Sequence, residues 1–359
     1  MEARFWEPAP AGKRVTCTLC PHFCEIREGM HGFCRVRKNV GGALVAESYG
    51  RFAAMALDPI EKKPLHHFHP HSYILSVGGC SCNMRCKFCQ NHEISQVRSR
   101  GDETAMPPQE LLRQALRLKE VARHGQPGHG DGHPDDGTEQ EGHVPEQEVR
   151  VPGQEVLAPG QEVRVNGQEV RVPGQEVRVP GQEVRAPGQP GNIGVAFTYN
   201  EPLIGIEYIL DAAPLLKKAG LKVVVVSNGL INEEPMEALL PWVDAWNIDL
   251  KSFADPFYRE HGVLAAGGLE IVKRSIAQAA PRAHLEVTTL IIPGVNDSPK
   301  EMQAMSRWLA GISPQIPLHL SRFFPRYQMR STPPTPIATL REMETIAKRH
   351  LAHVHVGNV

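Results

Sequence analysis

The chain has 359 residues, a formal net charge of −1 and a pI near 7.0, with 31 Pro and 32 Gly. This charge balance provides no whole-chain attraction to nucleic acid or to an anionic membrane surface. No apolar run approaches the about 20 residues of a membrane span, and residues 1–14 lack the apolar core of a secretory signal. We therefore expect a cytoplasmic protein with reduced thiols, in which clustered cysteines bind metal.

The first predicted unit is a cysteine-rich extension, residues 1–72. It contains four closely spaced cysteines, Cys17, Cys20, Cys24 and Cys34. Four thiols suit a tetrahedral zinc site or a second iron–sulfur cluster. The spacing differs from that of ferredoxins, which favours zinc or another metal over an electron relay, and both alternatives stay open.

A histidine-rich stretch closes this extension. It contains His66, His67, His69 and His71 and is punctuated by Pro64 and Pro70. Successive side chains on an extended segment point to opposite faces, so four histidines in such a stretch do not converge on one ion. We interpret them as surface histidines rather than a metal site.

The second predicted unit, residues 73–359, alternates strand-like and helix-like segments. The predicted strands are residues 73–77, 193–197, 222–226, 245–248, 284–292 and 317–320, and the predicted helices are residues 108–121, 203–219, 233–242, 264–280, 299–311 and 336–350. Strands that are apolar on both faces are typical of a parallel sheet covered by helices. The pattern predicts an α/β fold, a partial (β/α)6 TIM-like barrel with function at the carboxyl ends of its strands. A doubly wound sheet would produce the same alternation.

An insertion interrupts this unit at residues 122–191. Residues 121–191 hold 9 Pro and 13 Gly, and residues 144–185 form six consecutive seven-residue units such as VPGQEVR. The Pro-Gly pairs rule out a coiled coil, because they break or weaken a helix. We predict a mobile, disordered repeat in a surface loop, away from the catalytic mouth.

A cysteine triplet, Cys82-x3-Cys86-x2-Cys89, follows the first predicted strand. Three thiolates are one short of a closed zinc site or a fully ligated cluster. A [4Fe-4S] cluster held by three cysteines therefore leaves one iron open to a non-protein ligand. The alternative is a zinc knuckle that uses Cys80 as the fourth ligand, for which the Cys80-x-Cys82 spacing is tight.

With Phe88 before its last cysteine, this triplet resembles the signature of the radical S-adenosylmethionine (SAM) superfamily. The continuation Cys89-Gln90-Asn91 resembles the branch that includes pyruvate formate-lyase activating enzyme, and in particular the radical enzyme of the AmmeMemoRadiSam system. The resemblance covers nearly all of the chain except the insertion. It is carried by Cys17–Arg37, DPIEKKPLHHF, CNMRCKFCQNHEISQ, AFTYNEP, VSNG, NIDLKSF, IIPGVNDS, HLSRFFPRYQM and VGNV.

This resemblance implies the cofactors and the chemistry. Cys82, Cys86 and Cys89 would ligate three irons of a [4Fe-4S] cluster, and the fourth iron would bind the methionyl amino and carboxylate groups of SAM. An external flavodoxin- or ferredoxin-type donor would supply one electron for reductive cleavage of SAM. A hydrogen would then be removed from an unknown substrate, either a small molecule or a protein.

The resemblance also implies SAM contacts. Thr198, Tyr199, Asn200 and Glu201 correspond to the GGE-type motif, whose carbonyls and acidic side chain meet the methionyl ammonium. Since Tyr-Asn-Glu replaces Gly-Gly-Glu here, Glu201 is expected to act mainly by fixing the loop. Further expected contacts are Phe88, Asn91, Ser227 and Asn228. Taken alone, TYNEP also reads as a polar loop leading into a helix, and Ser-Asn-Gly as a turn.

Candidate catalytic residues follow the later strands. Asp249 and Lys251 resemble the DLK segment of activating enzymes and would face a shared polar cavity, with a plain salt bridge as the alternative. Arg322 is the third candidate catalytic residue. His319 and Tyr327 are further substrate-side candidates, for which a structural role is equally open.

Three functions remain open at this point. The main hypothesis is a radical SAM enzyme that acts on an unknown substrate. An alternative is an activase of glycyl-radical enzymes, and another is a non-catalytic iron–sulfur or zinc protein for electron transfer or metal binding. The TYNEP segment and the six strand–helix units argue against the last, because a simple electron carrier needs neither.

Overall fold

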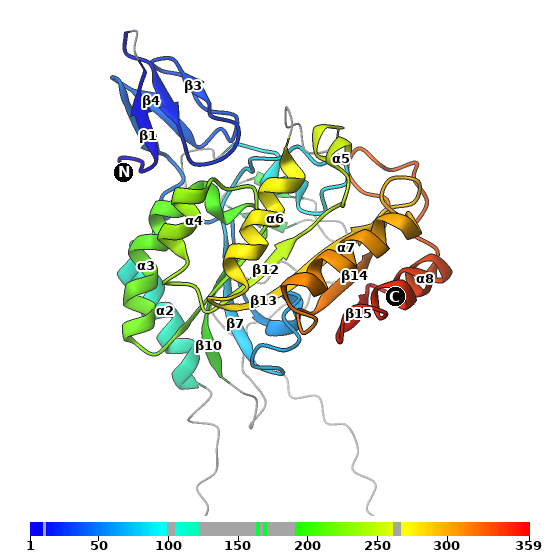
Figure 1. The fold of residues 1–359 in the computed structure, drawn as a ribbon. Helices are drawn as coiled ribbons and strands as arrows, with labels where there is room; N and C mark the ends of the chain where they lie inside the picture. The colour runs from blue at the N-terminus through cyan, green and yellow to red at the C-terminus, as the bar shows by residue number, and fades with distance from the viewer. Residues whose placement is uncertain (10–11, 99–104, 122–162, 166–167, 171–190, 261–266) are drawn as a thin grey trace, which may run out of the picture.

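An eight-stranded sheet forms the centre of the protein (Figure 1). The computed structural model describes residues 1–9, 12–98, 105–121, 163–165, 168–170, 191–260 and 267–359. The strand order is β15-β14-β13-β12-β11-β10-β7-β6, and all neighbours are parallel except β6 and β7. The strands are β6 (Ala54–Pro59), β7 (Tyr73–Gly78), β10 (Asn192–Phe197), β11 (Lys222–Ser227), β12 (Ala245–Asp249), β13 (His284–Ile291), β14 (Leu318–Arg322) and β15 (Val354–Gly357).

Helices connect the parallel strands. They are α1 (His92–Ser95), α2 (Pro108–Val121), α3 (Ile206–Lys218), α4 (Glu233–Leu239), α5 (Asp255–Glu260), α6 (Gly268–Ala279), α7 (Pro299–Ile312) and α8 (Ile337–Ala347), with 3-10 turns η1 (Ile60–Lys62) and η2 (Pro202–Gly205). Large apolar side chains such as Val225, Trp246 and Val287 belong to the main core beneath these helices. The opposite, inner face carries small or polar side chains such as Ala196, Asn247 and Thr288.

The predicted alternation is confirmed, since each of the six predicted strands overlaps an observed one. The consecutive strand order excludes the doubly wound alternative, in which the order reverses at a switch point. The fold is an α/β fold with a mostly parallel sheet, and the partial barrel remains a prediction. Two strands of this sheet were not predicted: β6, which lies inside the predicted extension but pairs with β7, and β15, which follows the last predicted helix.

Residues 60–72, which connect β6 to β7 in the chain, run across the inner face of the sheet; we call them the floor segment. The segment packs against inner-face residues of the sheet through Ile60, Leu65 and Phe68. The Pro64 carbonyl accepts a 2.8 Å hydrogen bond from the Asn247 amide of β12. The segment leaves β6 and enters β7 at the amino edge of the parallel strands, so it closes that end of the inner face.

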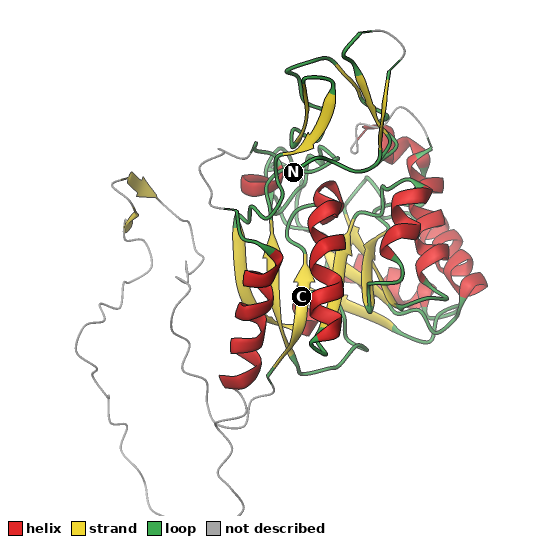
Figure 2. Ribbon diagram, turned by 90° about the vertical axis from the view of Figure 1, so that its left-hand side faces the viewer, coloured by secondary structure: helices red, strands yellow, loops and turns green. Residues whose placement is uncertain are grey.

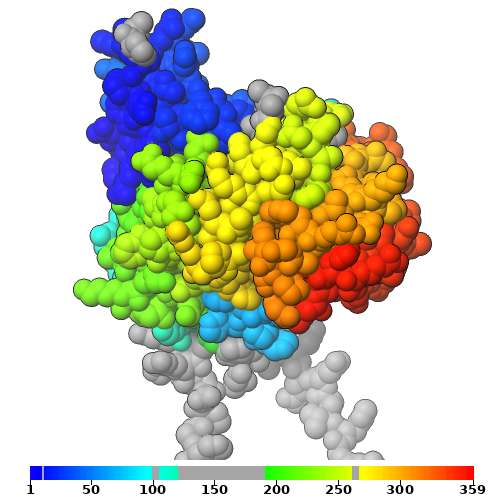
Figure 3. All heavy atoms as spheres, in the orientation of Figure 1, coloured from blue at the N-terminus to red at the C-terminus, as the bar shows by residue number. Residues whose placement is uncertain are grey.

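The N-terminal unit, residues 1–53, consists of strands and loops (Figure 2). Its elements are β1 (Trp6–Pro8), β2 (Val15–Cys17), β3 (Glu25–Ile26), β4 (Arg37–Val40) and β5 (Ala43–Ala46). It projects from one end of the body, coloured blue in Figure 3. The buried Arg37 guanidinium anchors it by a 2.8 Å ion pair to Glu207 of α3.

The predicted insertion joins the body at the opposite end. The chain enters β10 at the amino edge of the parallel sheet, and α2, which precedes the insertion, ends near the same side (Figure 1). Within the insertion, β8 (Val163–Val165) and β9 (Gln168–Val170) form an antiparallel pair. The rest of the predicted repeat lies outside the described residues. Among the described helices, we find none with the length and apolar character that a membrane span requires.

Candidate functional site

Four loops that leave the carboxyl ends of β7, β10, β11 and β12 form the candidate site. Because these strands are parallel and adjacent, their carboxyl ends meet at one edge of the sheet. The predicted cysteine triplet lies in the first loop, between β7 and α1, which we call the cysteine loop (residues 79–91). The other loops contribute the predicted residues at 198–201, 227–228 and 249–251.

The three thiols of the cysteine loop are wholly or partly buried and lie within electrostatic range of one another. The Met84 amide donates a 3.3 Å hydrogen bond to Cys82 Sγ, and the Cys89 thiol lies 3.0 Å from the Ser95 hydroxyl. Burial raises the pKa of Cys82 well above its ordinary value, with the negative charge of Glu201 adding to the effect. Burial also raises the pKa of Cys86 to about 12, although Lys251 opposes it. Binding a metal would therefore release protons from these thiols.

Asp249 and Lys251 form the salt bridge that was the structural alternative, with Nζ and Oδ2 2.9 Å apart. Burial alone would lower the pKa of Lys251. The negative charges of Asp249 and then Cys86 act in the opposite direction and outweigh burial, so the pKa of Lys251 lies above its ordinary value. Lys251 thus stays an ammonium ion beside the cysteine loop, where it offsets the charge of thiolates.

Glu201 ties two of the loops together. Its carboxylate accepts hydrogen bonds from the Leu203 amide at 3.1 Å, the Ser227 hydroxyl at 2.8 Å and the Asn228 amide at 2.8 Å. Burial raises the pKa of Glu201 to about 7 despite these three donors. The contacts agree with the expectation that Glu201 fixes the loop.

Asn228 binds the cysteine loop through its side chain. Its amide nitrogen donates to Asn83 Oδ1 at 2.8 Å and lies 3.7 Å from Cys82 Sγ, while its Oδ1 accepts from the Leu230 amide. The Asn83 amide in turn donates to the Leu230 carbonyl. The groups expected to contact SAM at this loop are thus engaged in holding the cysteines, and a cofactor role for Ser227 and Asn228 stays a prediction.

The loop after β10, at residues 198–200, contacts the backbone where β7 ends, at residues 78–81. Asn200 accepts from the Gly79 amide at 3.0 Å and donates to the Cys80 and Ser81 carbonyls at 3.2 and 2.9 Å. A Cβ on Gly78 would lie 2.6 Å from the Thr198 carbonyl oxygen, so only glycine allows this close approach. The predicted contact residue Asn91 donates to the Tyr199 carbonyl at 2.6 Å.

A buried group beneath this loop was not predicted from the amino-acid sequence. The Asp58 carboxylate accepts hydrogen bonds from the Tyr199 hydroxyl at 2.6 Å and the Lys63 ammonium at 2.7 Å. The ammonium also lies 4.6 Å from the centroid of the Tyr199 ring. Asp58 and Lys63 both belong to the DPIEKKPLHHF segment, so that segment was the available signal.

Four further predicted residues make contacts of other kinds. Phe88 is buried and packs 5.8 Å from the Phe257 ring centroid, as a core residue does. Arg322 donates from Nε to the Thr335 carbonyl at 2.8 Å. His319 is buried, and its ring donates to Glu286 at 2.6 Å beside the floor segment, which is the structural role left open by the sequence; a substrate-side role stays a prediction. Tyr327 stacks on His92, next to the cysteine loop.

The four histidines of residues 66–71 are exposed, as predicted. Two of them nevertheless border a cluster on β13–β15. The His66 and His67 amides donate to Glu286 at 3.0 and 2.8 Å, and the rings of His67 and His355 approach to 2.8 Å between their Nε2 atoms. Across the part of the chain that the structure describes, no three His, Cys, Asp or Glu side chains are placed to hold a metal ion as they stand.

The N-terminal unit gathers its four predicted thiols. The Cys17 amide donates to the Cys24 carbonyl at 3.0 Å where β2 and β3 pair, and Cys20 lies in the turn between them. Burial raises the pKa of Cys20, and the neighbouring thiols of Cys34, Cys17 and Cys24 raise it further. Burial likewise raises the pKa of Cys34 to about 11.

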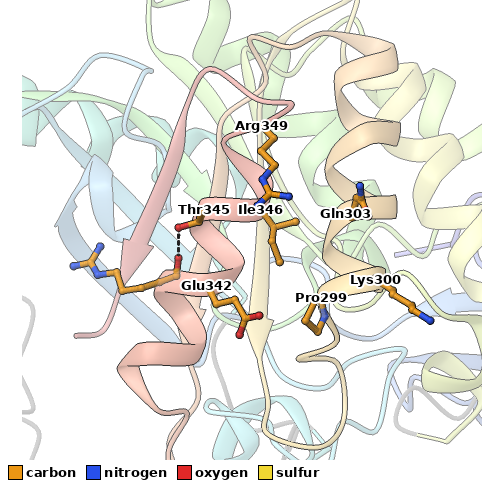
Figure 4. Close-up of a pocket in the computed structure, with 8 residues that line it drawn as sticks. Pro299, Lys300, Gln303, Glu342, Thr345, Ile346 and Arg349 are labelled. Carbon is orange, nitrogen blue, oxygen red and sulfur yellow. Dashed lines mark hydrogen bonds between the residues drawn. The ribbon is translucent and has the colours of Figure 1, made fainter.

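A surface groove of about 520 Å³ lies between α7 and α8 (Figure 4). It is lined by exposed side chains such as Lys300, Glu342 and Arg349. These helices cover the outer face of the sheet, so the groove does not belong to the candidate site.

No family model matches the chain. The chain is 32% identical over 364 residues to the uncharacterized protein MJ0808 of Methanocaldococcus jannaschii, a match that covers 100% of this chain and 85% of that protein. A second protein of that organism, the uncharacterized protein MJ0674, is 35% identical over 82 residues, which are 23% of this chain and 19% of that protein.

The solved structures that are similar to the chain include the following two. A radical SAM methyltransferase from Sphaerobacter thermophilus is 13% identical at a TM-score of 0.46, covering 81% of this chain and 67% of that chain. A domain of a pyruvate-formate lyase-activating enzyme from Bacteroides vulgatus is 19% identical at a TM-score of 0.40, covering 46% of this chain and 99% of that chain. At TM-scores below 0.5, these likenesses do not carry a functional assignment.

Proposed function

The chain belongs to the same family as the uncharacterized protein MJ0808 of Methanocaldococcus jannaschii, and we propose that it is a radical SAM enzyme. One observation carries the proposal: the three thiols of the cysteine loop, the Asn228 amide and the Lys251 ammonium gather at the carboxyl edge of a parallel sheet. This is the edge at which open α/β sheets and barrels bind their ligands. A [4Fe-4S] cluster with SAM would supply reductive cleavage of the sulfonium and hydrogen abstraction from a substrate.

The donor set fits such a cluster. Cys82, Cys86 and Cys89 provide one thiol for each of three irons and leave the fourth iron for the methionyl group. The Met84 amide hydrogen-bonds to the Cys82 sulfur, as donors to cluster sulfurs do. The Lys251 ammonium offsets the negative charge of the Cys86 thiolate.

The surrounding residues orient the loops and exclude water. Glu201 joins the loop after β10 to the loop after β11, and Asn200 joins it to the exit of β7. Both contacts are buried or partly buried, so they hold the cofactor-binding edge without reorganisation when SAM binds. The floor segment closes the amino end of the inner face, which limits water entry from that side.

Anaerobic reconstitution with iron and sulfide tests this function. We expect a brown protein that produces 5′-deoxyadenosine from SAM when dithionite is present, and a Cys82→Ala variant that produces none. Cys80→Ala is the matched control, because a three-cysteine cluster survives it whereas a zinc knuckle that uses Cys80 does not. If the cluster-loaded wild-type protein makes no more product than Cys82→Ala, the proposal is wrong.

The substrate and the electron donor belong to the same proposal. A flavodoxin- or ferredoxin-type protein would deliver the electron. An activase would generate a glycyl-radical EPR doublet on a partner protein, whereas other substrates would transfer deuterium into 5′-deoxyadenosine without one. A non-catalytic iron–sulfur protein would bind iron and show no affinity for SAM in equilibrium dialysis.

A further inference from the structure

The four thiols of the N-terminal unit converge from three short segments. Cys17 and Cys24 lie where β2 and β3 pair, with Cys20 in the connecting turn. The Phe33 amide, next to Cys34, donates a 3.3 Å hydrogen bond to Cys24 Sγ. Cys17, Cys20 and Cys34 are buried and Cys24 is partly buried. A small unit of strands and loops thus encloses four thiols without a disulfide.

A buried cation lies beside them. Arg37 is 1% exposed, and its charge acts on the thiols of Cys17 and Cys34. Its Nη1 binds Glu207 and its Nη2 binds the Arg4 carbonyl. Its Nε has no hydrogen-bond partner among the residues that the structure describes. A buried, unsatisfied N–H within electrostatic range of Cys17, Cys24 and Cys34 is suited to an anionic group such as a thiolate-ligated cluster.

The N-terminal thiols are joined to the cysteine loop by direct contacts. His22, between Cys20 and Cys24, donates from Nε2 to the Asn83 carbonyl at 2.8 Å. The Phe33 carbonyl, next to Cys34, accepts a 2.6 Å hydrogen bond from Arg85.

The same side chains form a stack. The His22 and Phe33 rings lie 4.0 Å apart, and the Arg85 guanidinium lies 4.4 Å from the centroid of the Phe33 ring. Arg85 also donates to the Cys82 carbonyl at 2.7 Å. Short polar and π contacts therefore run from one cysteine group to the other.

We propose that Cys17, Cys20, Cys24 and Cys34 hold a second, redox-active iron–sulfur cluster that relays an electron to the cysteine loop. The relay rests on the proposed function, since it needs a reducible cluster at Cys82, Cys86 and Cys89. An external flavodoxin- or ferredoxin-type protein is oxidised by one electron, and the N-terminal cluster is reduced. That cluster is reoxidised when the electron passes to the cluster of the cysteine loop, and no bond forms or breaks.

Iron and sulfide counts test the site itself. After anaerobic reconstitution of the full chain, we expect wild type to bind about two to four more irons than a Cys17→Ser/Cys24→Ser variant. A Cys82→Ala/Cys86→Ala/Cys89→Ala variant should retain iron and show an EPR signal after reduction. Zinc without iron in that triple variant, or no metal at all, overturns the proposal.

The relay is tested by the rate at which reduced flavodoxin reduces the cluster of the cysteine loop, followed by freeze-quench EPR. His22→Leu keeps all cysteines but removes the contact with Asn83, and we expect at least a tenfold lower rate. His31→Leu is the matched control, because His31 binds Glu47 in the same unit. Equal rates in wild type and both variants overturn the relay.

The two proposals fail differently. If the wild-type protein makes no 5′-deoxyadenosine with dithionite, the proposed function fails, whereas the metal counts still decide the N-terminal site. If His22→Leu makes normal amounts with dithionite and with flavodoxin, only the relay fails. Circular dichroism and gel filtration of each variant show whether it is folded. If the double serine variant does not fold, His22→Leu still tests the relay, because it leaves all cysteine ligands in place.

Discussion

The Tyr199 hydroxyl donates a 2.6 Å hydrogen bond to Asp58 Oδ2, across 141 positions of sequence. The same oxygen accepts from Lys63, whose ammonium lies beneath the Tyr199 ring. Tyr199 has a positive φ of 67°, in the left-handed region that a bulky side chain rarely adopts. The bond to Asp58 therefore helps to hold a strained residue in the loop that is expected to bind SAM.

Two neighbouring lysines allow a matched test of this group. Lys63 is 3% exposed and 2.7 Å from Asp58, whereas Lys62 is 68% exposed and 3.5 Å from it. Lys63→Met leaves a buried carboxylate without its cation, so we expect a loss of about 3–5 kcal/mol in the free energy of unfolding. Lys62→Met should cost less than about 1 kcal/mol. Urea denaturation measures both, and similar losses would contradict the argument.

The docking of the N-terminal unit depends on Arg37 and Glu207. Both side chains are 1% exposed and form a 2.8 Å ion pair. Arg37→Met should lower the free energy of unfolding by about 3–5 kcal/mol and expose the unit to limited proteolysis, because the buried Glu207 carboxylate loses its cationic partner and keeps only the Arg4 amide. Arg4, which is 50% exposed and pairs with Asp211, is the control. An Arg4→Met variant that is equally sensitive would contradict this role of Arg37.

The histidine cluster formed by His66, His67, His319 and His355 around Glu286 should make the stability of the fold sensitive to acid. Burial, followed by the charges of His319, His66 and His67, lowers the pKa of His355 to about 4 from 6.5, with Glu286 opposing. Below pH 6.5 the unfolded chain binds a proton that the folded chain rejects, so stability falls as the pH drops from 6.5 to 4. The pKa of Glu286 is lowered despite its burial, through hydrogen bonds from His284 and His319, so its contribution is lost at still lower pH.

Thermal unfolding across this pH range checks the prediction. A His355→Asn variant should show a flatter decline between pH 6.5 and 4 than wild type. His71→Asn serves as the control, since His71 is exposed on the same segment as His66. An unchanged decline in His355→Asn would remove the cluster as its cause.

Glu201 should matter for cofactor cleavage rather than for cluster assembly. Glu201→Gln replaces one acceptor oxygen with a donor, which cannot accept from the Asn228 amide. We expect iron content close to wild type and at least tenfold less 5′-deoxyadenosine, because the loops lose their alignment. Glu61→Gln, on the floor segment, is the control. Loss of iron in Glu201→Gln would instead assign it to cluster binding.

The repeat insertion should be dispensable. It joins the body at β10 on the amino edge of the sheet, opposite the cysteine loop. Deleting residues 127–190 is therefore expected to leave formation of 5′-deoxyadenosine unchanged. A variant that keeps its iron but loses this product would contradict the placement.

Local patterns in the amino-acid sequence were sufficient to predict the alternation of strands and helices and to place the cysteine triplet on the loop after β7. Strands apolar on both faces and amphipathic helices are signals within one segment, and the predicted helix 108–121 coincides with α2. Cys82, Cys86 and Cys89 are so close in sequence that they lie on one loop independently of the tertiary structure. The polar residues that follow β10, β11 and β12 were visible in the same way.

The partners of these residues were decided by tertiary structure. Glu201 meets Asn228, Tyr199 meets Asp58, and His22 meets Asn83 across 27, 141 and 61 positions. Such contacts depend on the order and register of parallel strands and on the path of the floor segment, which no local pattern encodes. That is why the pairing of His319 with Glu286 could not be predicted from the sequence, and why the link between the two cysteine groups emerged only from the folded chain.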